Sequence, residues 1–140
     1  MAKILNFEEL SKESELAKAC NMKTGLCHGV FDLVHFGHLE HFRKAKEQCD
    51  YLVVSLTPDK FINKGPGRPL FNEKIRAEHL SHIDYVDVIV INNDVSACDV
   101  IELLKPDFYF KGNEYRDEID VTGKIQSEKG YVEKNGGQLV

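Results

Sequence analysis

Short apolar runs alternate with longer amphipathic segments along most of this chain. Each run is rich in β-branched or aromatic residues, which is typical of strands, and the segments between them carry apolar residues at helical spacing. This pattern predicts strands at residues 25–30, 51–56, 86–91, 108–110 and 137–140. It predicts helices at residues 37–49, 72–82 and 95–104, the first with Leu39, Phe42 and Ala45 facing inward.

The segment before these elements has the pattern of an amphipathic helix. Leu10, Leu16 and Ala17 recur at helical spacing among polar residues, and Asn6 is a suitable N-cap. We therefore expect residues 1–22 to form an N-terminal helical extension and residues 23–140 to form the main domain.

Strands that are apolar throughout and alternate with helices indicate a mostly parallel sheet covered on both faces. The predicted fold is α/β, with a single Rossmann-like, doubly wound parallel sheet of about five strands. In such sheets ligands bind beyond the carboxyl ends of the strands.

Composition limits the class of partner. The 140 residues carry a formal net charge of −5, which argues against non-specific binding to nucleic acid or anionic membranes. No run approaches transmembrane length, and the first residues lack an apolar signal core. The four cysteines show no paired spacing, so we expect unreactive thiols in a reducing compartment and a cytoplasmic protein.

The segment from Gly29 to His38 carries the strongest candidate chemistry. It reads Gly-Val-Phe-Asp-Leu-Val-His-Phe-Gly-His and joins a predicted strand to a predicted helix. His35 and His38 are three residues apart, so on a helix both imidazoles lie on one face. The N-terminus of a helix also favours an anion, because its backbone N–H groups are unpaired and the helix dipole is positive there. This arrangement predicts a site for a phosphate chain.

The same segment resembles the His-x-Gly-His signature of the cytidylyltransferase-like nucleotidylyltransferases. The similarity continues in Lys64-Gly-x-Gly-Arg68-Pro69 and in Lys111-Gly112-Asn113-Glu114-Tyr115, which are most similar to the nucleotidylyltransferase domain of ADP-heptose synthases. The glycerol-3-phosphate cytidylyltransferases are the next most similar. The resemblance implies an enzyme that joins a nucleoside triphosphate, ATP or CTP, to a sugar phosphate or polyol phosphate and releases pyrophosphate. It also implies Mg²⁺ as cofactor, and homodimers are common among relatives.

Individual residues acquire expected roles from this resemblance and from their chemistry. Catalysis is expected of His35, His38 and Lys46, the last by reaching along its helix toward the acceptor phosphate. Nucleotide binding is expected of Gly29, Val30, Phe31, Asp32, Gly37, Lys111 and Gly112. Binding of the phosphorylated acceptor is expected of Lys64, Arg68 and Arg76. Asp32 is a candidate to hold the metal or to orient a histidine, and no protein cage for a metal is predicted.

Several alternatives stay open. His41 extends the histidine row, but no cysteine or carboxylate beside it has the spacing of a zinc site. Lys46 is compatible with a solvated lysine, and Arg76 with a partner on its own helix. His28 stands where relatives often have asparagine, and it either faces the pocket or packs. Relatives continue past the fifth strand into a Ser-Ser/Thr-Thr segment that the sequence does not reach. Either the sequence is one portion of a longer polypeptide or its phosphate site is incomplete, and a catalytically silent nucleotide-binding or regulatory module is the alternative function.

Overall fold

One parallel sheet of six strands runs through the protein, whose computed structural model describes residues 1–62, 67, 69–94, 96–111 and 124–140. The strand order is β1-β4-β3-β2-β5-β6, and every neighbouring pair is parallel. The strands are β1 (Lys3–Leu5), β2 (Thr24–Gly29), β3 (Tyr51–Leu56), β4 (Val88–Ile91), β5 (Phe108–Phe110) and β6 (Gln138–Leu139). The predicted α/β sheet is therefore confirmed, with one strand more than expected.

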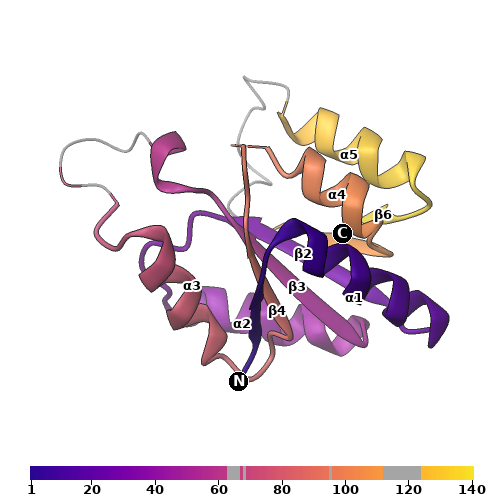
Figure 1. Ribbon diagram of the computed structural model, residues 1–140, viewed down its shortest axis with the longest axis horizontal. Helices are drawn as coiled ribbons and strands as arrows, with labels where there is room; N and C mark the ends of the chain where they lie inside the picture. Colours follow the sequence, from indigo (N-terminus) through magenta and orange to yellow (C-terminus); the bar gives the residue numbers. More distant parts are fainter. Residues whose placement is uncertain (63–66, 68, 95, 112–123) are drawn as a thin grey trace.

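Helices cover both faces of the sheet (Figure 1). The helices are α1 (Phe7–Ala19), α2 (Phe36–Gln48), α3 (Glu73–Ser81), α4 (Cys98–Leu104) and α5 (Lys124–Lys134), with a 3-10 turn η1 (Asp59–Phe61). Phe42 of α2 and Leu80 of α3 belong to the core on one face, whereas Leu10 of α1, Ile101 of α4 and Val132 of α5 belong to the core on the other. The apolar runs of the strands feed both cores, which is why the runs are apolar at every position.

The order of the strands creates a switch point between β2 and β5. From β2 the chain proceeds through α2, β3, α3 and β4 toward one edge of the sheet. It then returns through α4 to place β5 on the other side of β2. The connections leave β2 and β5 in opposite directions. In folds of this kind such a reversal opens a crevice beyond the carboxyl ends of the two strands, and ligands bind there.

The N-terminal segment is part of the same sheet. The predicted helix is confirmed as α1, and Asn6 caps it in a capping box with Glu9. The strand β1 was not predicted, because three residues are too few to show a period; it pairs with β4 at the edge. Leu10 is fully buried, so the extension contributes to the core.

Two further features differ from the sequence prediction. Helix α5 was not expected, because its charged residues mask a short apolar pattern. Leu39, expected to face inward, is 37% exposed, because it lies in the first turn of α2, where the chain has just left the end of the sheet. Phe42 and Ala45, one and two turns later, are buried as predicted.

Within the described residues, no helix is long and apolar enough to cross a membrane.

Candidate active site

Helix α2 begins with two histidines whose rings cap each other's backbone. His35 is the N-cap residue, and its Nδ1 accepts a hydrogen bond from the Gly37 N–H at 3.0 Å. His38 Nδ1 accepts one from the His35 N–H at 3.2 Å, and the two ring centroids lie 4.0 Å apart. Imidazole nitrogens here replace the Ser, Thr, Asp or Asn oxygens that usually cap helices. The caps fix both rings at the N-terminus of the helix, close to the carboxyl end of β2.

These contacts also determine the tautomer of each ring. A nitrogen that accepts an N–H has no hydrogen of its own, so in the neutral ring the hydrogen is on Nε2. Both imidazoles are therefore N–H donors at Nε2. The first turn of α2, all of it described, contains no acidic residue, whereas those of α1, α3 and α4 do. The charge and donors at this helix end suit an anion.

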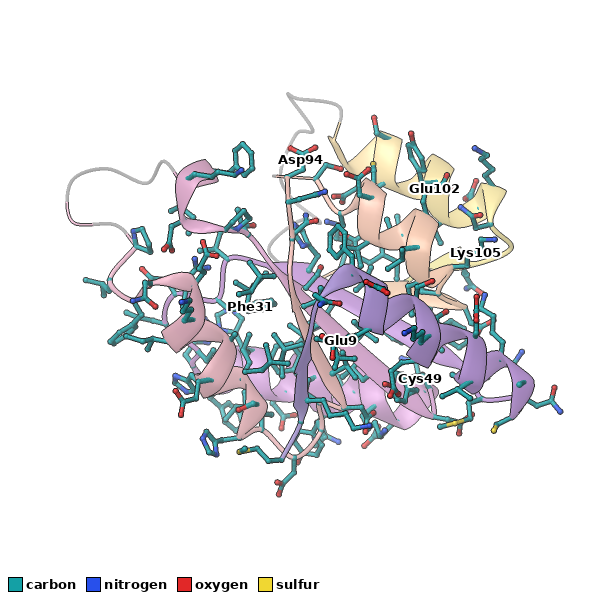
Figure 2. The ribbon with its side chains drawn as sticks, viewed as in Figure 1. Glu9, Phe31, Cys49, Asp94, Glu102 and Lys105 are labelled. Atoms are coloured by element: carbon teal, nitrogen blue, oxygen red, sulfur yellow. The ribbon has the colours of Figure 1, made fainter. Side chains whose placement is uncertain are left out.

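The turn before α2 is held by the ring of Phe31. This residue has a φ of 51°, a left-handed conformation that costs a non-glycine residue about 1–2 kcal/mol. Its ring packs edge-on against His38, with centroids 5.5 Å apart, and also against Phe42. A Cβ on Gly29 would lie 2.9 Å from the ring, so the glycine makes room for it. Phe31 is labelled in Figure 2 and belongs to the core on the α2–α3 side of the sheet.

Gly37 makes room for the His35 ring in the same way. A Cβ at Gly37 would lie 2.8 Å from His35 Cε1 and 3.0 Å from His35 Nδ1. The glycine between the two histidines therefore permits the N-cap contact itself, because any side chain there would push the ring away.

Asp32 anchors a loop. Its two carboxylate oxygens accept hydrogen bonds from the backbone N–H groups of Leu70 and Phe71, at 2.8 and 3.0 Å. Leu70 and Phe71 end the loop that contains Lys64 and Arg68, two predicted acceptor-binding residues that lie outside the described residues. Asp32 thus ties the end of that loop to the turn before α2.

Arg76 holds the same region together from inside. Its side chain is fully buried and donates to the carbonyl oxygens of Val30, Thr57 and Phe71 at 2.8–3.0 Å. It also forms a 2.7 Å ion pair with Asp59. Contact between Arg76 and the acceptor phosphate stays a prediction, which these hydrogen bonds do not test. The alternative of a partner on its own helix is wrong, because the guanidinium pairs with Asp59 and points across the ends of β2 and β3.

Lys46 lies at the other end of α2. Its Nζ donates to the Asp50 carbonyl oxygen at 2.8 Å and pairs with the Asp87 carboxylate at 2.5 Å. Asp50 and Asp87 precede β3 and β4, so Lys46 sits where the strands begin. The structure does not bring it together with His35 and His38, since a lysine in the last turn of a helix cannot reach back over two turns.

Lys111 lies across the switch point, one residue beyond β5. Its Nζ is 2.7 Å from Glu128 Oε1 on α5 and lies over the Tyr109 ring, 4.7 Å from the centroid. The Tyr109 hydroxyl donates to the same carboxylate oxygen at 2.9 Å, and the Ala97 N–H donates to Glu128 Oε2 at 2.8 Å. Gly112, the next predicted nucleotide-binding residue, lies outside the described residues.

Glu128 was missed by the sequence prediction. Its side chain is only 3% exposed. Burial by itself would raise the pKa of this carboxyl, but the Lys111 ammonium and the Ala97 N–H outweigh burial and hold the pKa below its ordinary value. Glu128 precedes the buried Val132 by four residues, so the carboxylate occupies an inward position of an amphipathic helix. That spacing is the signal that could have found it.

Two other histidines bond to neighbours on the sheet. His28 Nδ1 is 2.7 Å from the Ser55 hydroxyl on β3. His41 Nε2 is 3.7 Å from Cys27 Sγ. Burial raises the pKa of the Cys27 thiol far above its ordinary range, so this pair is not an activated nucleophile. Among the described residues, no cluster of His, Cys, Asp and Glu has the arrangement of a metal site.

A hollow of about 410 Å³ lies elsewhere, at the ends of β1 and β4. It is lined mainly by apolar residues, among them Ile4, Phe7 and Ile91. It contains none of the histidines or lysines discussed here, and we assign the site to the switch point, where the donors and charges gather.

Known proteins match nearly the whole of this chain in sequence. The bifunctional protein HldE of Hyphomonas neptunium is 36% identical over 141 residues, covering 99% of this chain. The HldE protein of Geobacter metallireducens is 39% identical over 136 residues, covering 94% of the chain. The chain spans 28% of the length of each of these relatives.

Solved structures share the fold. The lipopolysaccharide core biosynthesis protein of Thermoplasma volcanium superposes with a TM-score of 0.67 at 24% identity, covering 84% of this chain and 92% of that protein. The pantoate-β-alanine ligase of Francisella tularensis superposes with a TM-score of 0.60 at 14% identity, covering 100% and 66%. The model of the cytidylyltransferase-like family matches residues 26–138, which include the two histidines, Lys111 and Glu128. The resemblance read from the His-x-Gly-His segment is thereby confirmed, and the chain belongs to the cytidylyltransferase-like family.

Proposed function

We propose that this chain transfers a nucleotidyl group from a nucleoside triphosphate, ATP or CTP, to a sugar phosphate or polyol phosphate and releases pyrophosphate. The observation that carries the proposal is the reciprocal cap of His35 and His38, which aims two N–H donors from the positive end of α2 beside the switch point. The similarity to HldE proteins, over nearly the whole chain, supports the same reaction class.

The reaction needs no nucleophile from the protein. An oxygen of the acceptor phosphate attacks the α-phosphorus, and pyrophosphate leaves. Catalysis then consists of holding the two phosphates in line and stabilising the charge that develops on the triphosphate. The two Nε2–H groups supply such stabilisation, and because their rings are already fixed by the backbone, little reorganisation is needed.

Magnesium would arrive with the triphosphate. Asp32, the carboxylate proposed from the sequence to hold the metal or orient a histidine, already accepts hydrogen bonds from two backbone N–H groups. This donor set fits a Mg²⁺ ion bound mainly by phosphate oxygens and water, a common mode for this ion, and does not fit a cage of protein carboxylates. When bound, the ion would neutralise charge on the triphosphate.

The residues proposed to bind the acceptor phosphate are chosen by where their loop is anchored. The loop that carries Lys64 and Arg68 is tied by Asp32 and Arg76 to the turn before α2, so its cations are candidates for the acceptor phosphate. Gly112 follows Lys111 at the end of β5 and remains a candidate for nucleotide binding. Lys46, which pairs with Asp87, is not included in the site.

A pyrophosphate-release screen tests the proposal. ATP and CTP are each offered with Mg²⁺ and a panel of sugar phosphates, with glycerol 3-phosphate among the polyol phosphates. We expect turnover with at least one pair, and a loss of about 10²–10³-fold in rate for His35→Ala and for His38→Ala.

His79→Ala is the matched control, because His79 is exposed on α3, away from the crevice. Equal rates for the parent, His35→Ala and His38→Ala would refute the site. Nucleotide binding without turnover by any pair would favour the catalytically silent module instead.

A further inference from the structure

The β5 side of the crevice, across the switch point from His35 and His38, contains a buried ion pair; we call these two sides the second wall and the first wall. The side chains of Lys111 and Glu128 are only 12% and 3% exposed, and their charged atoms lie 2.7 Å apart. Glu128 uses both carboxylate oxygens, since Oε1 also accepts the Tyr109 hydroxyl and Oε2 accepts the Ala97 N–H. This carboxylate therefore joins the end of β5 to the start of α4 through a residue of α5.

The ion pair continues a row of polar side chains across the end of the sheet. His28 on β2 pairs in register with Ser55 on β3, and Cys27 pairs with Phe110, so Lys111 is the next residue opposite His28. The Glu128 carboxylate is near enough to His28 for the imidazole to help lower the pKa of the carboxyl. Beneath this row lies an apolar one, with Leu26 beside Tyr109. The polar row thus begins where the core ends, at the switch point.

Stability alone is a poor reason for such a pair. Desolvating two charges costs about as much as their attraction returns, and apolar residues of similar size often serve a core equally well. The exposed pair of Glu102 on α4 and Lys134 on α5, 3.5 Å apart, already links at the surface the two helices that the Glu128–Ala97 hydrogen bond joins. Glu102 is labelled in Figure 2, on the side of α4 near α5. Stabilising the contact between these elements therefore does not explain why Lys111 and Glu128 are buried, and a functional role is the better explanation.

We propose that Glu128 is a positioning residue that holds the Lys111 ammonium at the crevice, where the cation meets the anionic part of a bound nucleotide. The inference rests on the proposed function and adds Glu128, on α5, to a site whose histidines lie on α2. The Glu128 carboxylate and the face of the Tyr109 ring both contact the ammonium, and a backbone hydrogen bond from Lys111 N–H to the Val140 carbonyl oxygen, at 3.1 Å, holds the main chain of the lysine. A lysine side chain held in this way loses little conformational freedom when the nucleotide binds.

The first part of the test measures, in the absence of a nucleotide, how strongly Glu128 restrains the reactivity of the Lys111 amine. The full chain is acylated with a lysine-selective reagent, and the rate at each lysine is followed by mass spectrometry relative to exposed Lys12. In Glu128→Gln the rate at Lys111 should rise about tenfold, because the ammonium has lost its charged hydrogen-bond partner. In the matched control Glu102→Gln, which makes the same charge change at the surface pair, Lys111 should react as in the parent.

The other arm measures binding of ATP and of CTP, each with Mg²⁺, by titration calorimetry. Glu128→Gln should weaken binding about tenfold, and Lys111→Ala by at least as much. The double variant should bind no more weakly than Lys111→Ala alone, because Glu128 acts through Lys111. A merely structural carboxylate would give additive losses. Should Glu128→Gln not fold, Tyr109→Phe keeps both charges, removes a hydrogen bond to the same oxygen, and should shift both readouts in the same direction by less.

Additive losses in the double variant would overturn the inference, as would an unchanged labelling rate at Lys111 in Glu128→Gln. Unchanged nucleotide affinity in Glu128→Gln would do so as well. If the parent binds neither ATP nor CTP, the proposed function fails instead, and the labelling arm still reports whether Glu128 fixes Lys111.

Discussion

The two walls of the crevice are built in different ways. The His35–His38 wall comes from one short segment, in which each ring accepts a hydrogen bond from a backbone N–H two or three residues away. The Lys111–Glu128 wall brings together β5, α5 and the start of α4, with Ala97 and Glu128 separated by 31 residues in the sequence. One wall is a local motif, and the other exists only when the whole domain is folded.

The two walls should also differ in how much they contribute to the free energy of unfolding. A helix cap contributes about 1 kcal/mol, whereas a buried charge that loses its partner costs several times as much. Variants of the first wall should therefore lose function and keep their stability. Variants of the second wall should lose both.

The largest effect is expected at Glu128. Glu128→Gln leaves the Lys111 ammonium without a countercharge in a nearly closed site, which should lower the free energy of unfolding by about 3–5 kcal/mol. Glu102→Gln, at the exposed pair, should cost less than about 1 kcal/mol. Urea unfolding of the three proteins measures both values. Equal losses would mean that burial does not distinguish the two pairs.

The pH dependence of stability sharpens this point. The pKa of Glu128 lies below its ordinary value of 4.5, so its ionised form stabilises the fold above that pH, and the stabilisation is lost as the pH falls through the lowered pKa. The stability difference between the parent and Glu128→Gln should be constant above about pH 5 and shrink below about pH 4.5. Unfolding curves at several pH values test this. A difference that stays constant down to pH 3 would contradict the ionised pair.

His38→Ala should affect rate much more than stability. Loss of one donor to the triphosphate lowers the rate by about 10²–10³-fold, equivalent to about 3–4 kcal/mol in the barrier. Loss of its cap to the His35 N–H should cost about 1 kcal/mol of stability. Pyrophosphate release and thermal unfolding are measured on the same preparation. A large fall in the unfolding temperature would mean that His38, like Glu128, contributes strongly to the stability of the whole domain, which would contradict the local character of the first wall.

Gly37→Ala should displace the His35 ring. The new Cβ would lie 2.8 Å from His35 Cε1, and the ring must turn away and lose its bond to the Gly37 N–H. We expect about a tenfold loss of rate, since one donor is misplaced but not removed. Gly130→Ala on α5 is the control, because in the described part of the chain nothing beyond its chain neighbours and its own helix backbone lies within 4 Å of the new Cβ, and it should leave the rate unchanged.

The smallest effect is expected at Lys46. Lys46→Met breaks the partly exposed pair with Asp87, at a cost of about 1 kcal/mol or less in stability. Nucleotide affinity and turnover should stay within about twofold of the parent, because the lysine lies at the opposite end of α2. A hundredfold loss of rate would mean that Lys46 takes part in catalysis, as the sequence analysis predicted.

The fold class, the span of most elements and the His35–His38 pair could all be predicted from the order of residues alone. Each of these depends on periodicity or on contacts between residues a few positions apart, and such contacts are visible in a linear chain. The period of apolar residues located α2 and β3, and the spacing of His35 and His38 located the donors.

The partners of the buried charges became clear only from the folded protein. Arg76 and Lys46 looked like ligands for phosphate, yet each is paired with a distant aspartate, and Glu128, which the sequence analysis did not single out, pairs with Lys111. The pairing of a long, charged side chain depends on which elements the fold places beside it, and no short-range pattern encodes that.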